Sequence, residues 1–309
     1  MFRYIVLRLL GIAPVLLGIS IFVFLIQHLI PGDLAELIVS QARAGVSPEQ
    51  TAELRHRLGL DDPVAVQYVR WLGKAVTGDL GRSYYTNRLV TDTIAEQIPA
   101  TLRLTGSAMF LAVVMGGMLG LISALKQNTW IDSLALTFSL GGLSVPMFWS
   151  GLMLIYLFGV QLNWLPVTSD QSWKGIILPT VTLGYDTAAF ITRMVRTSVL
   201  EILRQDYVIT ARAKGLRQRL VIIRHVLKPA MPPIATLLGL LAGRLLGGAV
   251  VVETVFARQG LGRLVVESIM HKDYFLVQGI VLVGAMIYVV INLIVDVSYF
   301  WLDPRVRVS

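Results

Sequence analysis

The sequence predicts an all-α membrane protein with six transmembrane helices and a helical extracytoplasmic insert after the first of them. Its 309 residues are 55% hydrophobic and only 15% charged, and their mean hydropathy is +0.69. Soluble domains, in contrast, carry about 25% charged residues. Crossing a hydrocarbon core takes about 20 apolar helical residues. Stretches of that kind recur six times along the chain.

Charged residues bound the apolar stretches except at the end of the third, near Val160, and the first stretch begins at Leu9. No small-residue cleavage site follows Ile30-Pro31-Gly32, so we expect this first helix to be retained rather than removed as a signal peptide. The six stretches lie between Arg8 and Asp33, Arg103 and Lys126, Asp132 and Val160, Lys174 and Arg193, Lys228 and Glu253, and Asp273 and Asp296.

Basic residues gather on one side of the predicted bundle. Arg3 and Arg8 precede the first stretch, Lys126 lies between the second and third, and nine Lys or Arg against two acidic residues separate the fourth from the fifth. Because Lys and Arg mark cytoplasmic loops, we expect both termini in the cytoplasm. The net charge of +8 is then a consequence of topology, and no nucleic-acid partner is expected.

The segment 33–100 is polar and predicts a helical insert outside the membrane. One helix is expected from an N-cap at Ser47 to Leu58, a second from Asp62-Pro63 to a stop at Gly78, and a third over 90–98 that Pro99 ends. A solvated cap is one interpretation of this insert, and a docking surface or an extracytoplasmic gate is the other.

The segment from Glu201 to Met231 is too charged to span a membrane and too periodic to be coil. It predicts two short amphipathic helices separated at Gly215 that lie along the cytoplasmic surface. Two roles fit: helices held on anionic membrane lipid by Lys and Arg, or a peg that docks in a groove of a soluble partner. The apolar faces are Ile209, Ala213 and Leu216 in the first helix and Leu220, Ile223 and Leu227 in the second.

The run Thr210-Ala211-Arg212-Ala213-Lys214-Gly215 resembles the cytoplasmic loop of permease subunits of binding-protein-dependent ABC importers. That family's pattern is Glu-Ala-Ala, three residues, Gly, nine residues, Ile-x-Leu-Pro, and this chain matches it in register at Ala211, Gly215 and Leu227. The departures resemble the oligopeptide, dipeptide, nickel and glutathione branch. They are Ile209, Thr210 and His225 in place of Glu, Ala and Ile, and a proline, Pro229, that comes one place late.

Further segments along nearly the whole chain are similar to that branch in their order and spacing. They are 29–33, 58–63, 78–81, 99–102, 247–253, 260–263, 271–274 and 303–305.

The resemblance implies a type I ABC importer permease of the bacterial inner membrane. Such a chain forms, with a second homologous permease, the pathway for peptides or related small solutes, with nickel or glutathione as alternative cargoes. Two ABC ATPase subunits and a periplasmic or lipid-anchored substrate-binding protein are the further partners that it implies. The residues implied to couple the chain to the ATPases are Tyr207, Thr210, Ala211, Ala213, Lys214, Gly215 and Leu216.

The chain lacks the Gly-x-x-x-x-Gly-Lys-Ser/Thr phosphate-binding loop, so ATP and Mg are expected in the partner ATPases and no cofactor in this chain. Its four histidines are scattered without metal-ligand spacing, and no catalytic constellation argues for an enzyme. A secondary transporter working alone would predict internal repeats, and none is found.

The expected organisation follows from these assignments. It comprises a cytoplasmic N-terminus and first helix at 1–32, a periplasmic helical insert at 33–100, a five-helix permease core at 101–300 with the coupling loop 199–229, and a cytoplasmic tail at 301–309.

Two charges lie inside predicted spans, where a lone charge costs about 2.5–3.5 kcal/mol. We expect these, Asp186 and Arg244, to pair or to contact a peptide's termini in a polar cavity, as candidate pathway residues. A purely structural ion pair is the alternative. Gly239, Gly243 and Gly247 put small residues on one face of the fifth span, for packing within the subunit or against the second permease.

Overall fold

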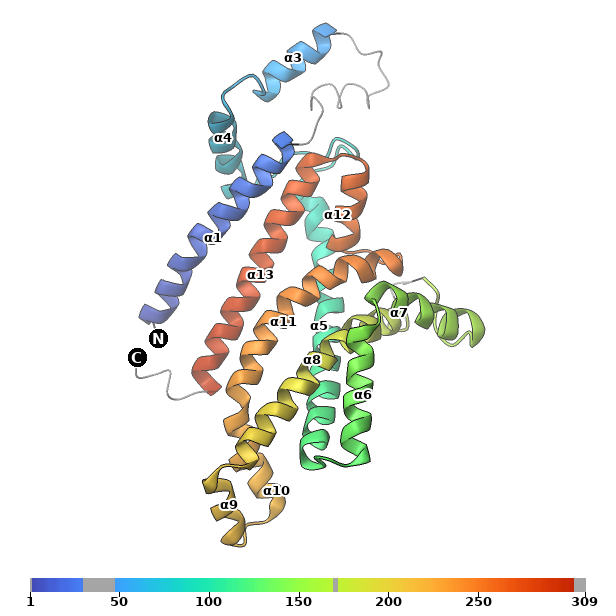
Figure 1. Ribbon diagram of the computed structural model, residues 1–309. Helices are drawn as coiled ribbons and strands as arrows, with labels where there is room; N and C mark the ends of the chain where they lie inside the picture. The colour runs from blue at the N-terminus through green and yellow to red at the C-terminus, as the bar shows by residue number, and fades with distance from the viewer. Residues whose placement is uncertain (1, 30–47, 169–171, 303–309) are drawn as a thin grey trace. The chain divides into compact units, whose positions relative to one another are not determined.

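The computed structural model describes residues 2–29, 48–168 and 172–302. The regular structure in these ranges is helical (Figure 1), and their only β pairing is an isolated antiparallel bridge between Arg82 and Leu89. The chain divides into two compact units. The first unit comprises Pro99–Arg263 and Tyr288–Ser309, and the second comprises Phe2–Ile98 and Leu264–Ile287.

The first unit is built around α8 (Ile177–Leu203), which packs against α6, α7 and α11. Small and apolar side chains along α8 are buried in these contacts, as its run of Ala, Thr, Leu and Val allows. The other helices of this unit are most of α5 (Val90–Leu125), α6 (Trp130–Ser144), α7 (Met147–Leu154), the π-helix η1 (Ile155–Gln161), α9 (Asp206–Ala213), α10 (Gln218–Leu220), the π-helix η2 (Val221–Leu227), α11 (Lys228–Val255) and the end of α13 (Tyr274–Leu302).

The second unit contains α1 (Phe2–Leu29), α3 (Pro48–Leu58), α4 (Val64–Val76) and most of α12 (Leu261–Met270). Two of the three helices predicted for the segment 33–100 are confirmed as α3 and α4, and the glycine beyond each has the left-handed backbone of a helix stop, with φ of 68° at Gly59 and 86° at Gly78. The predicted N-cap, Ser47, lies outside the described residues.

Three described helices are long and apolar enough to cross a membrane: Val90–Leu125, Gln218–Val255 and Tyr274–Val295. A bent pair of helices adds a fourth if it counts as one span, and α1 contains a shorter apolar helix over Gly11–Leu25. In place of the predicted fourth span lies α8, which is 27 residues long and less apolar. Length and composition therefore support three or four of the six predicted spans.

The prediction that Pro99 ends a separate helix is wrong, because α5 runs through it from Val90 to Leu125. A proline in a helix interior removes one backbone hydrogen bond and crowds the preceding turn. Pro99 itself is exposed, but the helix continues into the apolar stretch that starts after Arg103, where an interrupted helix would leave backbone groups without partners. Continuing the helix keeps the remaining groups bonded, and the predicted short helix is therefore the first part of a long one.

The predicted third span is broken at Val145, where α6 gives way to α7 at an angle of 104°. Val145 is extended, with φ −98° and ψ 127°, and Pro146 follows it. The ring of a proline disfavours helical backbone at the residue before it. Pro146 thus sits at a helix boundary, unlike Pro99 inside α5.

The backbones of α5 and α8 approach each other closely at two glycines of α5. A Cβ built at Gly116 would lie 2.7 Å from the carbonyl oxygen of Ala188, and one at Gly120 would lie 2.6 Å from that of Thr192. Side chains at these positions would overlap the backbone of α8. The spacing of four residues keeps both glycines on one helix face, where such contact is possible.

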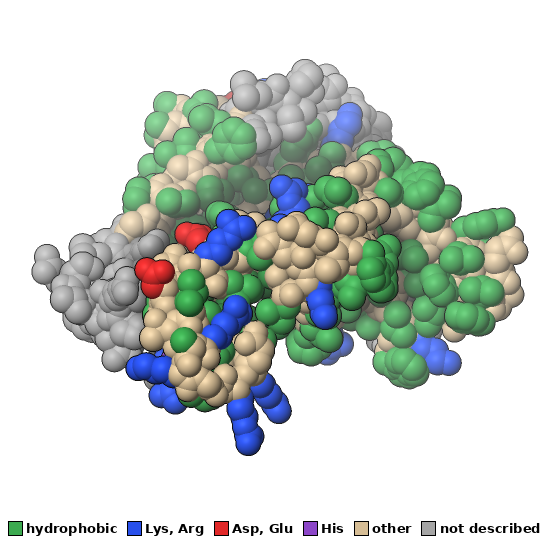
Figure 2. All heavy atoms as spheres, turned by 60° about the horizontal axis from the view of Figure 1, so that its bottom comes forward, with side chains coloured by type: hydrophobic (Ala, Val, Ile, Leu, Met, Phe, Trp, Pro, Cys, Tyr) green, Lys and Arg blue, Asp and Glu red, His purple; other side chains and the backbone are tan. Residues whose placement is uncertain are grey.

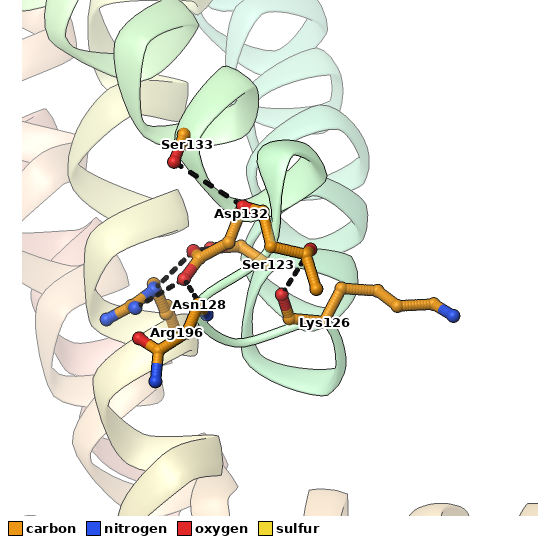
Figure 3. A network of polar contacts seen from close by, with 7 residues as sticks. Ser123, Lys126, Asn128, Asp132, Ser133 and Arg196 are labelled. Atoms are coloured by element: carbon orange, nitrogen blue, oxygen red, sulfur yellow. Dashed lines mark hydrogen bonds and ion pairs between the residues drawn. The ribbon is translucent and has the colours of Figure 1, made fainter.

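A buried ion pair joins the first turn of α6 to α8 (Figure 3). Asp132, which is 3% exposed, accepts hydrogen bonds from Arg196 Nε at 2.9 Å and Nη2 at 2.8 Å. The same carboxylate accepts the backbone N–H of Asn128 at 3.0 Å and the hydroxyl of Ser123. Every oxygen of this buried carboxylate is therefore satisfied, and the sequence pattern marked Asp132 only as the border of a span.

Replacing Gly116 with Val is predicted to destabilise the first unit, because the added atoms would collide with α8. Overpacking of this kind costs about 1–3 kcal/mol. Gly117→Val is the matched control, since no described atom lies within 4 Å of its Cβ position. Heating the detergent-solubilised protein and measuring the folded fraction by size-exclusion chromatography should give a lower midpoint for G116V than for G117V. Equal midpoints would contradict the close approach.

Asp132→Asn is predicted to cost roughly 3–5 kcal/mol, because it leaves the Arg196 guanidinium partly buried without its counter-charge. The control is Glu201→Gln, at an exposed position of α8, the helix that carries Arg196. This substitution should change the thermal midpoint little. In the double variant D132N/R196M the unpaired charge is gone, so part of the loss should be recovered. The same thermal assay would count against the ion pair if D132N and E201Q melted alike.

Candidate functional site

The segment Asp206–Leu227, hereafter the α9–η2 segment, is folded onto the adjoining ends of α8 and α11. Its side chains Val208, Ala211, Val221 and Val226 are buried in one apolar cluster with Val199 of α8. Since the cluster continues along α8 and α11, the segment is an ordered extension of the helix bundle rather than a loose loop.

The prediction of two short helices separated at Gly215 is confirmed for the first and altered for the second. The first helix is α9, and Gly215 follows it with φ of 76° and its N–H bonded to the Arg212 carbonyl at 2.9 Å. The second, α10, continues through η2 into α11, so that Gln218–Val255 forms a single helix of 38 residues. Only one turn separates α9 from this continuous helix, so a displacement of α9 would be transmitted to α11.

The outer surface of the α9–η2 segment combines exposed apolar side chains with positive charge. Tyr207 is 45% exposed, Ile209 55% and Ile223 53%. Figure 2, which turns this end of the molecule forward, shows Lys and Arg side chains projecting from it and few acidic ones. The exposed basic residues are Arg212, Lys214, Arg217, Arg219 and Arg224, and Lys228 follows them at the start of α11.

The residues implied to couple to an ATPase divide between the two sides of this segment. Ala211 is buried, at 6% exposed, and helps anchor α9. The others are available to a partner: they are the exposed Tyr207, Thr210, Ala213, Lys214, Gly215 and Leu216.

The structure brings the two charges of the predicted spans together. Arg244 Nη2 on α11 lies 3.3 Å from Asp186 Oδ2 on α8, and it donates a long hydrogen bond of 3.4 Å to Oδ1. The Arg244 guanidinium also lies over the Phe190 ring, 4.3 Å from its centroid. The arginine side chain is 50% exposed and the aspartate 13%. The pair is thus open to its surroundings on the arginine side.

The three glycines of α11 do not have the same neighbours. A Cβ at Gly239 would lie 2.9 Å from Val295, and one at Gly243 would lie 2.3 Å from the Tyr288 ring, both on α13. No described atom lies within 4 Å of a Cβ at Gly247. Two of the three therefore serve packing within the subunit, and the third borders open space.

A buried glutamate that the sequence marked only as the end of a span joins α5, α11 and α12. Glu253, with no exposed area, accepts hydrogen bonds from Thr101 Oγ1 at 2.7 Å, Gly262 N at 2.8 Å and Arg263 N at 3.2 Å. A Cβ at Gly260 would lie 2.2 Å from its carboxylate. The glycines at 260 and 262 are thus needed so that the chain can wrap around Glu253.

The chain matches two protein families. Residues 116–308 match the binding-protein-dependent transport system inner membrane component, and residues 1–105 match the N-terminal part of the corresponding membrane component. The glutathione transport system permease protein GsiC of Escherichia coli strain K12 is 42% identical over 311 residues, covering 99% of both chains. The dipeptide transport system permease protein DppB of Alkalihalophilus pseudofirmus is 41% identical over 335 residues, covering 99% of this chain and 100% of the relative.

The fold is similar to that of a chain in a solved structure of the MetNI methionine ABC transporter in an inward-facing conformation. The match covers 68% of this chain and 96% of the MetNI chain, with a TM-score of 0.59 and 19% sequence identity. At that identity the likeness shows the fold alone, which is that of an ABC importer permease. The two family matches and the near full-length relatives show that the chain belongs to the family of binding-protein-dependent transport system inner membrane components and is the multi-pass permease component of an ABC importer.

Proposed function

We propose that this permease and a second, homologous permease together form the translocation pathway for peptides or related small solutes. The observation that carries the proposal is the 41–42% identity, over nearly the full chain, to permeases named for dipeptide and for glutathione. Glutathione and nickel complexes remain the alternative cargoes within this branch. The family consists of permease subunits, which argues against a transporter that works alone and against an enzyme.

The proposed topology has six spans with both termini in the cytoplasm. Besides the long apolar helices, it counts α1, α8 and the bent pair α6–η1 each as one crossing. Two observations support it: the apolar stretch Gly11–Leu25 within α1, and the exposed Lys and Arg on the α9–η2 segment, which the positive-inside rule puts in the cytoplasm. The proposed parts are 1–32, the periplasmic insert 33–100, the core 101–300 and the tail 301–309.

The α9–η2 segment is proposed to dock on one of two ATPase subunits, which hold the ATP and Mg. Its exposed Tyr207, Ile209 and Leu216 would fill an apolar groove while the surrounding Lys and Arg meet a polar rim. The buried Val208 and Ala211 would keep α9 rigid as it is pushed. Such a peg passes mechanical work from the ATPase to α8 and α11 without any covalent step in this chain.

The helical insert is proposed to face a periplasmic or lipid-anchored substrate-binding protein. Aromatic packing supports a preformed surface: the Phe24 ring of α1 lies 5.4 Å from Tyr68 and 5.7 Å from Trp71 of α4, measured between centroids. On the outer side of α4, Val66 and Val69 are exposed, at 45% and 67%. These contacts hold α4 on α1 while leaving an apolar face for a partner.

Ala213→Glu is predicted to uncouple the permease from its ATPases, because it adds bulk and an opposing charge at the exposed end of α9. We expect co-purification of the ATPase subunits and solute-stimulated ATP hydrolysis to fall about tenfold, a loss of ~1.4 kcal/mol in docking. Gln127→Glu, at an exposed position of the turn between α5 and α6, is the control and should leave both unchanged. Normal coupling in A213E with normal thermal stability would reject the docking surface.

Uptake by proteoliposomes is predicted to require ATP, both permeases and the ATPase subunits. A labelled dipeptide should accumulate only when ATP is supplied on the cytoplasmic side of the permease and the binding protein on its periplasmic side. Omitting the ATPases is the control. Transport that continued without them would show that the chain works alone, and the proposal would fail.

A further inference from the structure

Two Arg–Asp pairs share α8, and they differ in how completely they are formed. In the first, Arg196 grips Asp132 through two hydrogen bonds of 2.8 and 2.9 Å, and the arginine side chain is 21% exposed. In the second, Arg244 makes one long hydrogen bond of 3.4 Å to Asp186, and the arginine side chain is 50% exposed. The first pair is closed and structural, whereas the second leaves its cation available.

Most donors of Arg244 have no acceptor among the described residues. A guanidinium carries several N–H donors in a planar fork, and only Nη2 of Arg244 is used. The Arg244 guanidinium carbon, Cζ, lies over the Phe190 ring, 4.3 Å from its centroid. This cation–π contact stabilises the charge without using an N–H donor. An arginine held this way can still bind an anion through a bidentate contact.

The exposed side of α11 has room for such a ligand. Leu240, Arg244, Gly247 and Val251 follow at spacings of three and four residues and are all exposed, so they form one stripe. No described atom lies within 4 Å of a Cβ at Gly247, one turn beyond Arg244. Because a charge facing lipid tails would be expensive, this stripe fits a polar cavity or a partner surface.

Asp186 is suited to orient the arginine rather than to bind a solute. Its side chain is only 13% exposed, and Oδ2, although near Arg244, accepts no hydrogen bond in the described structure. A solute passing along α11 therefore meets the guanidinium before it meets the carboxylate. Arg244 is therefore an exposed positive charge, and its counter-charge, Asp186, is more deeply buried.

We propose that Arg244 binds the carboxylate of the transported solute as it passes through the permease, and that Asp186 is its positioning residue. The inference rests on the proposed function, because it requires the exposed stripe of α11 to line the pathway. It adds the chemical group that the pathway recognises, and it assigns different roles to the two members of the pair.

A charge-selective label tests whether the stripe is open and positive. The chain contains no cysteine, so Gly247→Cys introduces a single thiol. The assembled transporter is treated with anionic 2-sulfonatoethyl or cationic 2-(trimethylammonio)ethyl methanethiosulfonate, and peptides of this chain are followed by mass spectrometry. We expect the thiol of G247C to prefer the anionic reagent roughly tenfold, relative to the preference of a free thiol, as one nearby positive charge in a protein environment would give. Arg244→Gln should abolish this preference.

Thr254→Cys is the matched control for the label. It lies ten residues along the same helix, about 15 Å from Arg244, so R244Q should leave its reagent preference unchanged. ATP-dependent uptake by the wild-type transporter tests the proposed function by itself. If that uptake is intact but neither reagent labels G247C, or both label it equally, only the Arg244 inference is wrong.

Uptake of a labelled dipeptide and of its C-terminal amide, both at saturating concentration, tests for the carboxylate. The binding protein is unchanged, so its own preference cancels when each variant is compared with wild type. R244Q should slow the acid about tenfold relative to the amide, R244K should retain part of the difference, and D186N should be intermediate. Equal slowing of both solutes would overturn the proposal. If the amide is not carried, the free acid should protect G247C from labelling only when Arg244 is present.

Discussion

The buried contact between Asp132 and Arg196 is the interaction on which the geometry of the proposed docking end depends. It clamps the first turn of α6 to α8, seven residues before α8 ends at Leu203. The α9–η2 segment begins almost at once, at Asp206. Because breaking a buried ion pair is costly, a push on α9 cannot be absorbed by separating these helices. It must move α6 and α8 together.

The helix that would take such a push also carries Asp186, one member of the open charge pair. Asp186 precedes Arg196 on α8 by ten residues, about 15 Å along the axis. The other partner, Arg244, lies on α11, which is continuous with the α9–η2 segment through α10 and η2. Any relative motion of α8 and α11 would therefore change the distance between Asp186 and Arg244. Under the proposed function, the state of the ATPases is thereby linked to the solute contact through rigid helices.

The parts of this fold that the sequence predicts are those with local signals. Glycine stops at 59, 78 and 215 need only backbone chemistry, and they fall where the pattern places them. Proline is harder, since Pro146 breaks a helix and Pro99 does not. The difference depends on what surrounds each proline. The partners of Asp132 and Glu253 were missed for the same reason, because Arg196 and Thr101 are distant in sequence.

Three acidic side chains in the helices of the first unit show how incomplete satisfaction marks a site. Glu253 is held by a hydroxyl and two backbone N–H groups, and Asp132 by an arginine, a hydroxyl and a backbone N–H. Among the described residues, Asp186 has only the long contact with Arg244. Buried polar groups are nearly always fully bonded because leaving them unpaired is costly. A helix bundle that completes two carboxylates and gives the third one long contact leaves the charge of Arg244 only partly neutralised, as the proposed contact between Arg244 and a solute carboxylate requires.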